Sequence, residues 1–116
     1  MRKRYRLRHN TDFQRLRQEG QVKRHPDAMI SYRPNDLPHN RYGFITAKNL
    51  GNAVKRNRVR RLMRECVRLQ HPHIKQGYDV VFIARPPIVA KPFQQVHRIV
   101  YDLLRRAGLN PKEPDL

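Results

Sequence analysis

Seven basic side chains are concentrated between residues 55 and 68, where only Glu65 is acidic. They are Lys55, Arg56, Arg58, Arg60, Arg61, Arg64 and Arg68. Guanidinium groups are planar and bind phosphate through two parallel hydrogen bonds, whereas lysine is a point charge. A solvated charged face is the ordinary alternative, but such faces mix both signs to form salt bridges, and this one does not. The stretch therefore predicts a surface that binds phosphate groups.

The composition of the whole chain supports a polyanionic partner. The 116 residues include 26 Lys+Arg against 9 Asp+Glu, which gives a formal net charge of +17. A compact domain with this charge repels itself unless it binds nucleic acid or an anionic membrane, and the excess of arginine favours nucleic acid. No run reaches the roughly 18 apolar residues of a membrane span. The start lacks the apolar region of a secretory signal. The single Cys66 excludes an internal disulfide. We therefore expect a cytoplasmic protein without a membrane partner.

Apolar positions within the same stretch indicate how the arginines are held. They recur at spacings of three or four residues, which place them on one face of a helix. These positions are Val59, Leu62, Met63, Cys66 and then Leu69 or Gln70. Gly51 and Asn52 supply a turn and a cap before the helix, which ends at about Gln70 because His71 precedes a proline. With this face packed on a sheet, the basic side chains form an oriented array, with one line of Arg60, Arg64 and Arg68 and an adjoining line of Asn57, Arg61 and Arg64.

Five further elements are predicted around this helix. Helices are expected at 10–20 and 92–108, and strands at 27–33, 41–49 and 78–85. The last strand is almost wholly apolar, which is typical of a central strand covered on both faces. The order helix, strand, strand, helix, strand, helix predicts an α+β two-layer sandwich of three helices and a small mixed sheet of three or four strands.

Composition also divides the chain. Residues 1–9 form a basic arm, residues 10–108 a single domain that is expected to bind nucleic acid, and residues 109–116 a loose tail. The arm either stays a solvated tail in the free protein or adds phosphate contacts on a polyanion. Pro26 is expected at the start of the first strand or at a break in an edge strand.

No residue pattern indicates catalysis or metal binding by the protein itself. Cys66, His71 and His73 do not have the spacing of a zinc motif. A two-metal nuclease needs clustered carboxylates, and the candidate acids fall on different predicted elements. These acids are Asp12, Asp79 and Asp102.

The segment GNAVKRNRVRRLMRE, residues 51–65, resembles the RNR motif of the bacterial ribonuclease P protein subunit. Three flanking segments agree with this family. LRHNTDFQRLRQEG resembles its N-terminal helix, RYGFITAKNLGNAV the strand and turn before the motif, and GYDVVFIARPP the strand after it. The resemblance covers about residues 5–108.

This resemblance implies the same order of elements, with an unusual left-handed crossover from strand to helix to strand. It implies the protein component of ribonuclease P, an accessory subunit of the enzyme that removes the 5′ leader of precursor tRNA. The catalytic RNA would perform the hydrolysis with divalent metal ions, so Mg²⁺ is expected at the RNA active site and no cofactor on the protein. The implied partners are the catalytic RNA and precursor tRNA, with one protein monomer for each RNA.

The charge array and the family's motif together predict ten RNA-binding residues. They are Lys48, Asn52, Lys55, Arg56, Asn57, Arg58, Arg60, Arg61, Arg64 and Arg68. By its chemistry alone, Asn57 is an ordinary surface residue near a helix start, and only the resemblance makes it a contact. Asn49 stands where the family often has a second lysine.

The family holds the leader in a cleft beside the same helix, and stacking on aromatic side chains is how proteins hold single strands without reading their sequence. The expected cleft residues are Phe13, Arg17, Tyr32, Asn57, Arg61 and Arg64. Phe13 matches an aromatic that packs against the leader, with a plain core position as its alternative. One helical turn after Phe13 the family commonly has a second aromatic residue, and this chain has Arg17 there. Tyr32 lies on the opposite face of its strand from Met29 and Ser31, and either set is compatible with the cleft.

Two other functions fit parts of this pattern. A ribosomal or general RNA-binding module shares the charge and the fold, and differs in the RNA that it binds. A protein nuclease would depend on the three acids named above.

Overall fold

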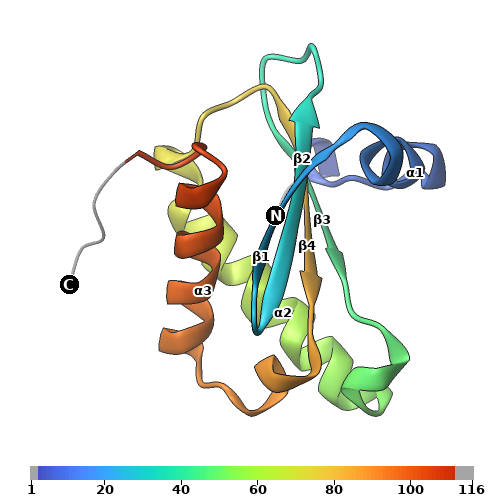
Figure 1. Ribbon diagram of the computed structural model, residues 1–116, viewed down its shortest axis with the longest axis vertical. Helices are drawn as coiled ribbons and strands as arrows, with labels where there is room; N and C mark the ends of the chain where they lie inside the picture. The colour runs from blue at the N-terminus through green and yellow to red at the C-terminus, as the bar shows by residue number, and fades with distance from the viewer. Residues whose placement is uncertain (1–2, 112–116) are drawn as a thin grey trace.

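A four-stranded mixed sheet forms the centre of the computed structural model, which describes residues 3–111 (Figure 1). Side by side, its strands are β1 (Gln21–His25), β2 (Ala28–Pro34), β4 (Tyr78–Ala84) and β3 (Arg41–Ile45). β2 is antiparallel to both β1 and β4, whereas β3 is parallel to β4. The three predicted strands are all present, although the second ends at Ile45, because Lys48–Leu50 forms a short 3₁₀ helix.

β1 is the element that the pattern of the sequence does not reveal. Four of its five residues are exposed, so it has no alternation of apolar and polar positions. Pro26 and Asp27 lie in the tight turn that joins it to β2, so the proline is in a turn rather than in a strand. An edge strand that is mostly polar and basic is a common way to prevent further strand pairing.

The three helices are α1 (Asn10–Glu19), α2 (Ala53–Gln70) and α3 (Phe93–Arg106). α2 and α3 pack together on one face of the sheet, and α1 lies on the other face (Figure 1). The sheet and the α2–α3 layer enclose the main core, which confirms the α+β sandwich of three helices. A smaller apolar cluster of Leu7, Leu16 and Val81 lies under α1.

The apolar stripe of α2 lies on the sheet as its spacing predicts. Its buried residues are Val59, Met63, Cys66, Val67 and Gln70. Of the two candidates for the last position, Leu69 is 45% exposed, whereas Gln70 is buried and donates from Nε2 to the carbonyl oxygen of His97 at 3.2 Å. Burial of each apolar side chain contributes about 1.5–3 kcal/mol. The stripe therefore determines which way the charged face of α2 points.

Both ends of the packed region extend beyond the predicted domain of 10–108. The backbone of Arg6 forms a parallel bridge with Tyr42, and Leu7 is buried. Leu109 and Asn110 are buried as well, and the carbonyl oxygen of Leu109 accepts from the backbone N–H of Lys75 at 2.7 Å. Leu109 and Asn110 are therefore part of the packed region, and residues 112–116 of the expected tail lie outside the described residues. No helix within residues 3–111 is both long and apolar enough to cross a membrane.

Candidate nucleic-acid interface

The start of α2 is held by a cap and by a glycine. The side chain of Asn52 accepts from the backbone N–H of Lys55 at 2.9 Å, as an N-cap asparagine does. Gly51 has a φ of 127°, a conformation that side chains with a Cβ rarely adopt. Lys48 and Asn49 are exposed in the 3₁₀ helix just before this turn, so they lie beside the first basic residues of α2.

Arg60 is held by two side chains from different elements. Its guanidinium group donates to Asn57 Oδ1 at 2.9 Å and to Thr46 Oγ1 at 2.5 Å. One contact is within α2 and the other reaches the loop after β3, so the guanidinium group is fixed between the helix and the sheet. Asn57 therefore has a structural role, because it orients Arg60, and its exposed side chain stands next to that cation.

Arg64 lies one helical turn further along α2, over the ring of Phe44. Its guanidinium carbon is 5.9 Å from the ring centroid, within the range of a cation–π interaction. Phe44 in turn stacks on Phe82, with 5.9 Å between ring centroids and 12° between planes. Partial burial, followed by the charges of Arg6 and Arg60, lowers the pKa of Arg64 from its ordinary value. Positive groups converge at this point.

The remaining basic residues of α2 have different surroundings. Arg68 forms two hydrogen bonds with Glu65, at 2.6 and 2.9 Å, so its charge is largely compensated. Arg58 is exposed and donates to the carbonyl oxygen of Val89 at 3.3 Å. Lys55 and Arg61 are exposed, and Arg56 is half-buried. The array is therefore not uniform, and Arg60 and Arg64 are the two arginines that face the sheet edge.

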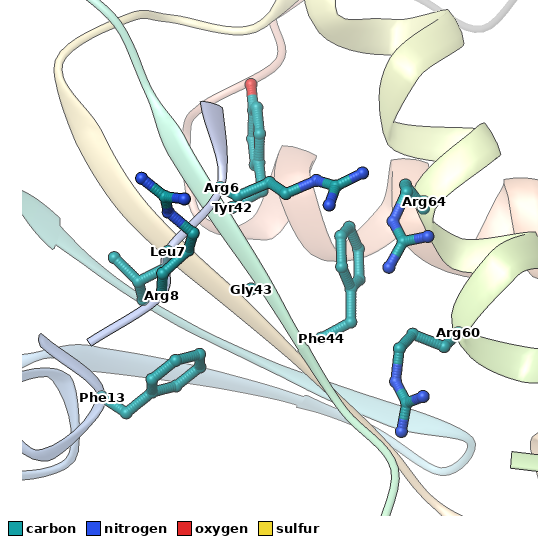
Figure 2. Close-up of a pocket in the computed structure, with 9 residues that line it drawn as sticks. All are labelled: Arg6, Leu7, Arg8, Phe13, Tyr42, Gly43, Phe44, Arg60 and Arg64. Atoms are coloured by element: carbon teal, nitrogen blue, oxygen red, sulfur yellow. The ribbon is translucent and has the colours of Figure 1, made fainter. Parts of the chain in front are cut away.

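A cleft of about 210 Å³ opens where α2 passes the edge strand β3 (Figure 2). Its walls come from three parts of the chain: the N-terminal segment and α1, the strand β3, and α2. The lining residues are Arg6, Leu7, Arg8, Phe13, Tyr42, Gly43, Phe44, Arg60 and Arg64. A Cβ on Gly43 would come within 2.8 Å of the ring of Phe13, so the glycine is what lets that ring approach β3.

The structure brings together only part of the predicted leader cleft. Phe13 and Arg64 line it, whereas Arg17, Asn57 and Arg61 are exposed outside its lining. Phe13 is half-buried, which fits a wall better than a plain core position.

Tyr32 does not line this cleft. In the register of the sheet it is opposite Gln21 and Val80, and its ring packs in the core on the α2–α3 side. Its neighbour Ser31 faces α1 instead and donates to the carbonyl oxygen of Leu16 at 3.3 Å. The hydroxyl group of Tyr32 donates to Gln21 Oε1 at 3.1 Å, and burial raises the pKa of Tyr32.

Phe44 and Arg6 are cleft residues that sequence reasoning missed. Alternation along 41–49 does place Phe44 on the face of β3 towards α2, but the pattern does not show that β3 is an edge strand. Arg6 belongs to the arm, which pairs with β3 through a single bridge. A basic residue immediately before a buried leucine is the only signal available, and it is weak.

Two of the three scattered acids meet in the structure, where an arginine holds them. Arg41 donates to both carboxylate oxygens of Asp79, at 2.8 and 2.7 Å, and reaches Asp12 at 3.4 Å. These bonds, led by the one to Asp79, raise the pKa of Arg41. The contact ties α1 to the sheet and so helps to set the position of Phe13.

Cys66 and His71, which do not have the spacing of a zinc motif, have structural roles. Cys66 is buried in the core, and burial raises the pKa of its thiol to about 12. His71 Nδ1 is 2.8 Å from the hydroxyl oxygen of Tyr42, and burial lowers the pKa of His71. Within residues 3–111, no group of three or more His, Cys, Asp or Glu side chains could hold a metal ion.

Comparisons with known proteins agree on one family. The family model for ribonuclease P matches residues 1–108. The ribonuclease P protein component of Roseiflexus castenholzii is 46% identical over 110 residues, which are 94% of this chain and 90% of that protein. The ribonuclease P protein component of Chloroflexus aurantiacus is 42% identical over 112 residues, which are 96% of this chain and 83% of that protein.

Solved structures give the same result. A Staphylococcus aureus RNase P protein mutant with defective mRNA degradation activity superposes with a TM-score of 0.88 at 30% identity, covering 92% of this chain and 91% of that one. The RNase P protein from Thermotoga maritima in complex with 1-(4-fluorophenyl)-2-thiourea superposes with a TM-score of 0.82 at 30% identity. The match covers 87% of this chain and 98% of that one. The chain therefore belongs to the family of bacterial ribonuclease P protein components.

Proposed function

We propose that this chain supplies the RNA-binding surface of ribonuclease P and leaves the chemical step to the RNA. The protein functions in the maturation of tRNA 5′ ends as the protein component of that enzyme. Its catalytic RNA is the first partner, and the 5′ leader of precursor tRNA is the second. One protein monomer joins one RNA, in the cytoplasm, where precursor tRNA is made.

One observation carries this proposal: Arg60 and Arg64 are directed by the packing of α2 into a cleft whose other walls include Phe13 and Phe44. Guanidinium groups bind the phosphates of a strand, and aromatic rings accept its bases whatever their identity. Leaders differ in sequence from one tRNA to another, so a grip of this kind suits them. The exposed basic residues just before α2 and in its first turns are left for the catalytic RNA, namely Lys48, Lys55, Arg58 and Arg61.

The assignment of catalysis to RNA is supported by the environment of the acids. Asp12 and Asp79 are engaged by Arg41, and Asp102 pairs with Arg98 on α3 at 3.1 Å. A two-metal hydrolase needs carboxylates that are free to bind the ions. We therefore place Mg²⁺ at the RNA active site, with no cofactor held by the protein.

Reconstitution tests the proposal. Protein freed of RNA is combined with the ribonuclease P RNA of its own host and with precursor tRNA at physiological salt. We expect leader removal only when both protein and RNA are present, and unchanged cleavage when Asp102→Asn replaces the native protein. Cleavage by the protein alone would contradict the proposal. Recovery of ribosomal RNA without ribonuclease P RNA in a pull-down would favour a general RNA-binding module instead.

A further inference from the structure

The N-terminal segment crosses the edge of the sheet and is held on both sides of it. The backbone N–H of Leu7 donates to the carbonyl oxygen of Tyr42 at 2.8 Å, next to the parallel bridge of Arg6. Leu7 is buried in the small cluster under α1, whereas Tyr5 packs against the main core on the other side. We call residues 4–8 the strap, and Figure 2 shows that it forms the wall of the cleft opposite α2.

Two histidines flank the ring of Tyr5 and hold this end of the strap. The ring centroid of Tyr5 is 5.5 Å from that of His39, which it meets edge to face, and 5.0 Å from that of His71. His39 belongs to the loop between β2 and β3, and His71 follows the last residue of α2. All three rings are half-buried. The docking of Tyr5 therefore depends on two side chains that can take up a proton.

The hydrogen bonds of the Tyr42 hydroxyl group define the protonation state of His71 in this arrangement. Asn40 Nδ2 donates to the hydroxyl oxygen of Tyr42 at 3.0 Å, and His71 Nδ1 is 2.8 Å from the same oxygen. Because the oxygen accepts from Asn40, the hydroxyl proton is available for Nδ1, which can accept it only while the imidazole is neutral. Asn40 is buried and also donates to the carbonyl oxygen of Lys75 at 2.8 Å, so this arrangement is fixed from below. We therefore assign a neutral His71 to the docked strap.

The groups around these rings offer no compensation for a positive charge. The guanidinium group of Arg4 lies over the ring of Tyr5, 4.8 Å from its centroid, and Arg68 in the last turn of α2 is paired with a glutamate of its own helix. Among the described residues, the ring contacts and hydrogen bonds given for His39 and His71 include no carboxylate. Burial, followed by the charge of His39, lowers the pKa of His71. A proton on His71 would thus be both poorly solvated and close to other cations.

We propose that the strap is an acid-released latch, in which neutral His71 keeps Tyr5 docked and the wall of the cleft closed, and protonation of His71 releases that wall. The pKa of His71 is lowered while the strap is docked and returns to its ordinary value of about 6.5 when the strap is released. The docked state is therefore fully favoured above that pH. It loses stability as the pH falls through about 6.5, because the released state takes up a proton that the docked state excludes. The inference rests on the proposed function for the use of the wall, and adds its regulation.

Hydrogen exchange of the Leu7 amide in the protein without RNA tests the latch, because this amide is bonded to Tyr42 only while the strap is docked. Protection factors are compared, since they remove the pH dependence of exchange itself. A single histidine excluded from protonation changes the opening equilibrium by at most about tenfold between about pH 7.5 and 5.5. We expect the protection factor of Leu7 to fall by about three- to tenfold over this range. Amides in the central strand β4 report global unfolding and should change less.

The matched variants are His71→Asn and His73→Asn. Asparagine keeps an acceptor near the position of Nδ1 but takes up no proton, so His71→Asn should make the protection factor of Leu7 independent of pH over this range. His73 is exposed two residues later, and its variant should keep the native response. Tyr5→Leu removes the flanked ring, so it should lower protection at both pH values and abolish the difference between them. A constant protection factor in the native protein, or an unchanged response in His71→Asn, would overturn the latch.

A second measurement links the latch to the cleft. In the reconstituted enzyme at about pH 7.5, exchange of the strap is followed by mass spectrometry with leader-bearing precursor tRNA and with leaderless tRNA. A leader that needs the closed wall should raise protection of the strap by at least about threefold over the leaderless complex. Equal protection in the two complexes would overturn the link to the cleft. Failure of the proposed function is distinct, because the native enzyme would then show no leader-dependent affinity while the pH response of the protein alone stayed the same.

Discussion

Arg64 and Arg68 are four residues apart on α2 and look equivalent in the sequence, yet the structure predicts different contributions to RNA binding. Arg64 lines the cleft with no carboxylate in the lining, whereas Arg68 forms two hydrogen bonds with Glu65. Replacing each by alanine therefore compares a cation directed into the cleft with one already paired on the protein surface.

The magnitude follows from counterion release. Each contact to a phosphate of a single strand contributes about 0.7 to the slope of log affinity against log salt, so one lost contact changes affinity by about threefold between roughly 50 and 200 mM salt. Arg64→Ala should flatten the slope by about this amount. Arg68→Ala should flatten it by less than half as much, and Glu65→Gln, which releases Arg68, should make the slope steeper.

The assay is titration of the protein into the catalytic RNA bound to precursor tRNA, repeated at several salt concentrations. This mixture presents every RNA surface at once, so the result does not depend on which RNA contacts Arg64. An equal fall in slope for Arg64→Ala and Arg68→Ala would refute the distinction between the two residues. Unchanged slopes in both would show that this face of α2 does not meet RNA.

Three further predictions concern the scaffold of the cleft. Arg41→Leu leaves the buried carboxylate of Asp79 without its strongest partner, so the free energy of unfolding in urea should fall by about 2–4 kcal/mol; a loss below about 1 kcal/mol would contradict this role. Gly43→Ala displaces the ring of Phe13 and should weaken leader-dependent affinity, while the free energy of unfolding changes by no more than about 1 kcal/mol; unaltered leader binding would count against Phe13 as a wall. Burial raises the pKa of Tyr42 to about 12, so the native state keeps its proton where the unfolded chain has lost it, and stability should fall by about 2–3 kcal/mol as pH rises from about 10 through 12. Tyr42→Phe should lose that part of the pH dependence, and an identical alkaline profile would show that the hydroxyl group is not responsible.

The orientation of α2 could be predicted from the sequence because it depends on local spacing. Val59, Met63 and Cys66 recur at helical intervals, and a helix that buries them has no freedom to rotate. The cap at Asn52 depends on the same short range of sequence. Features that depend on residues within one or two helical turns of each other can be predicted from the sequence pattern.

The composition of the cleft depends instead on contacts between distant segments. β1 is polar and exposed, so nothing in its residues shows that it pairs with β2 and leaves β3 at the other edge. The face on which Tyr32 lies follows from the register between β1, β2 and β4, since a shift of one residue would reverse it. For the same reason Phe44 and Arg6 become cleft residues only once β3 is known to be an edge strand.

The central claim is that a single strand of RNA lies in the cleft between Phe13, Phe44 and the arginines of α2. Photo-crosslinking tests it most directly, with 4-thiouridine placed at successive leader positions of precursor tRNA in the reconstituted enzyme and the adducts mapped by mass spectrometry. We predict adducts at Phe44, at Phe13 or within residues 60–64, from a short run of consecutive leader positions. Adducts confined to β1 and the exposed face of α3, with none around the cleft, would contradict the account.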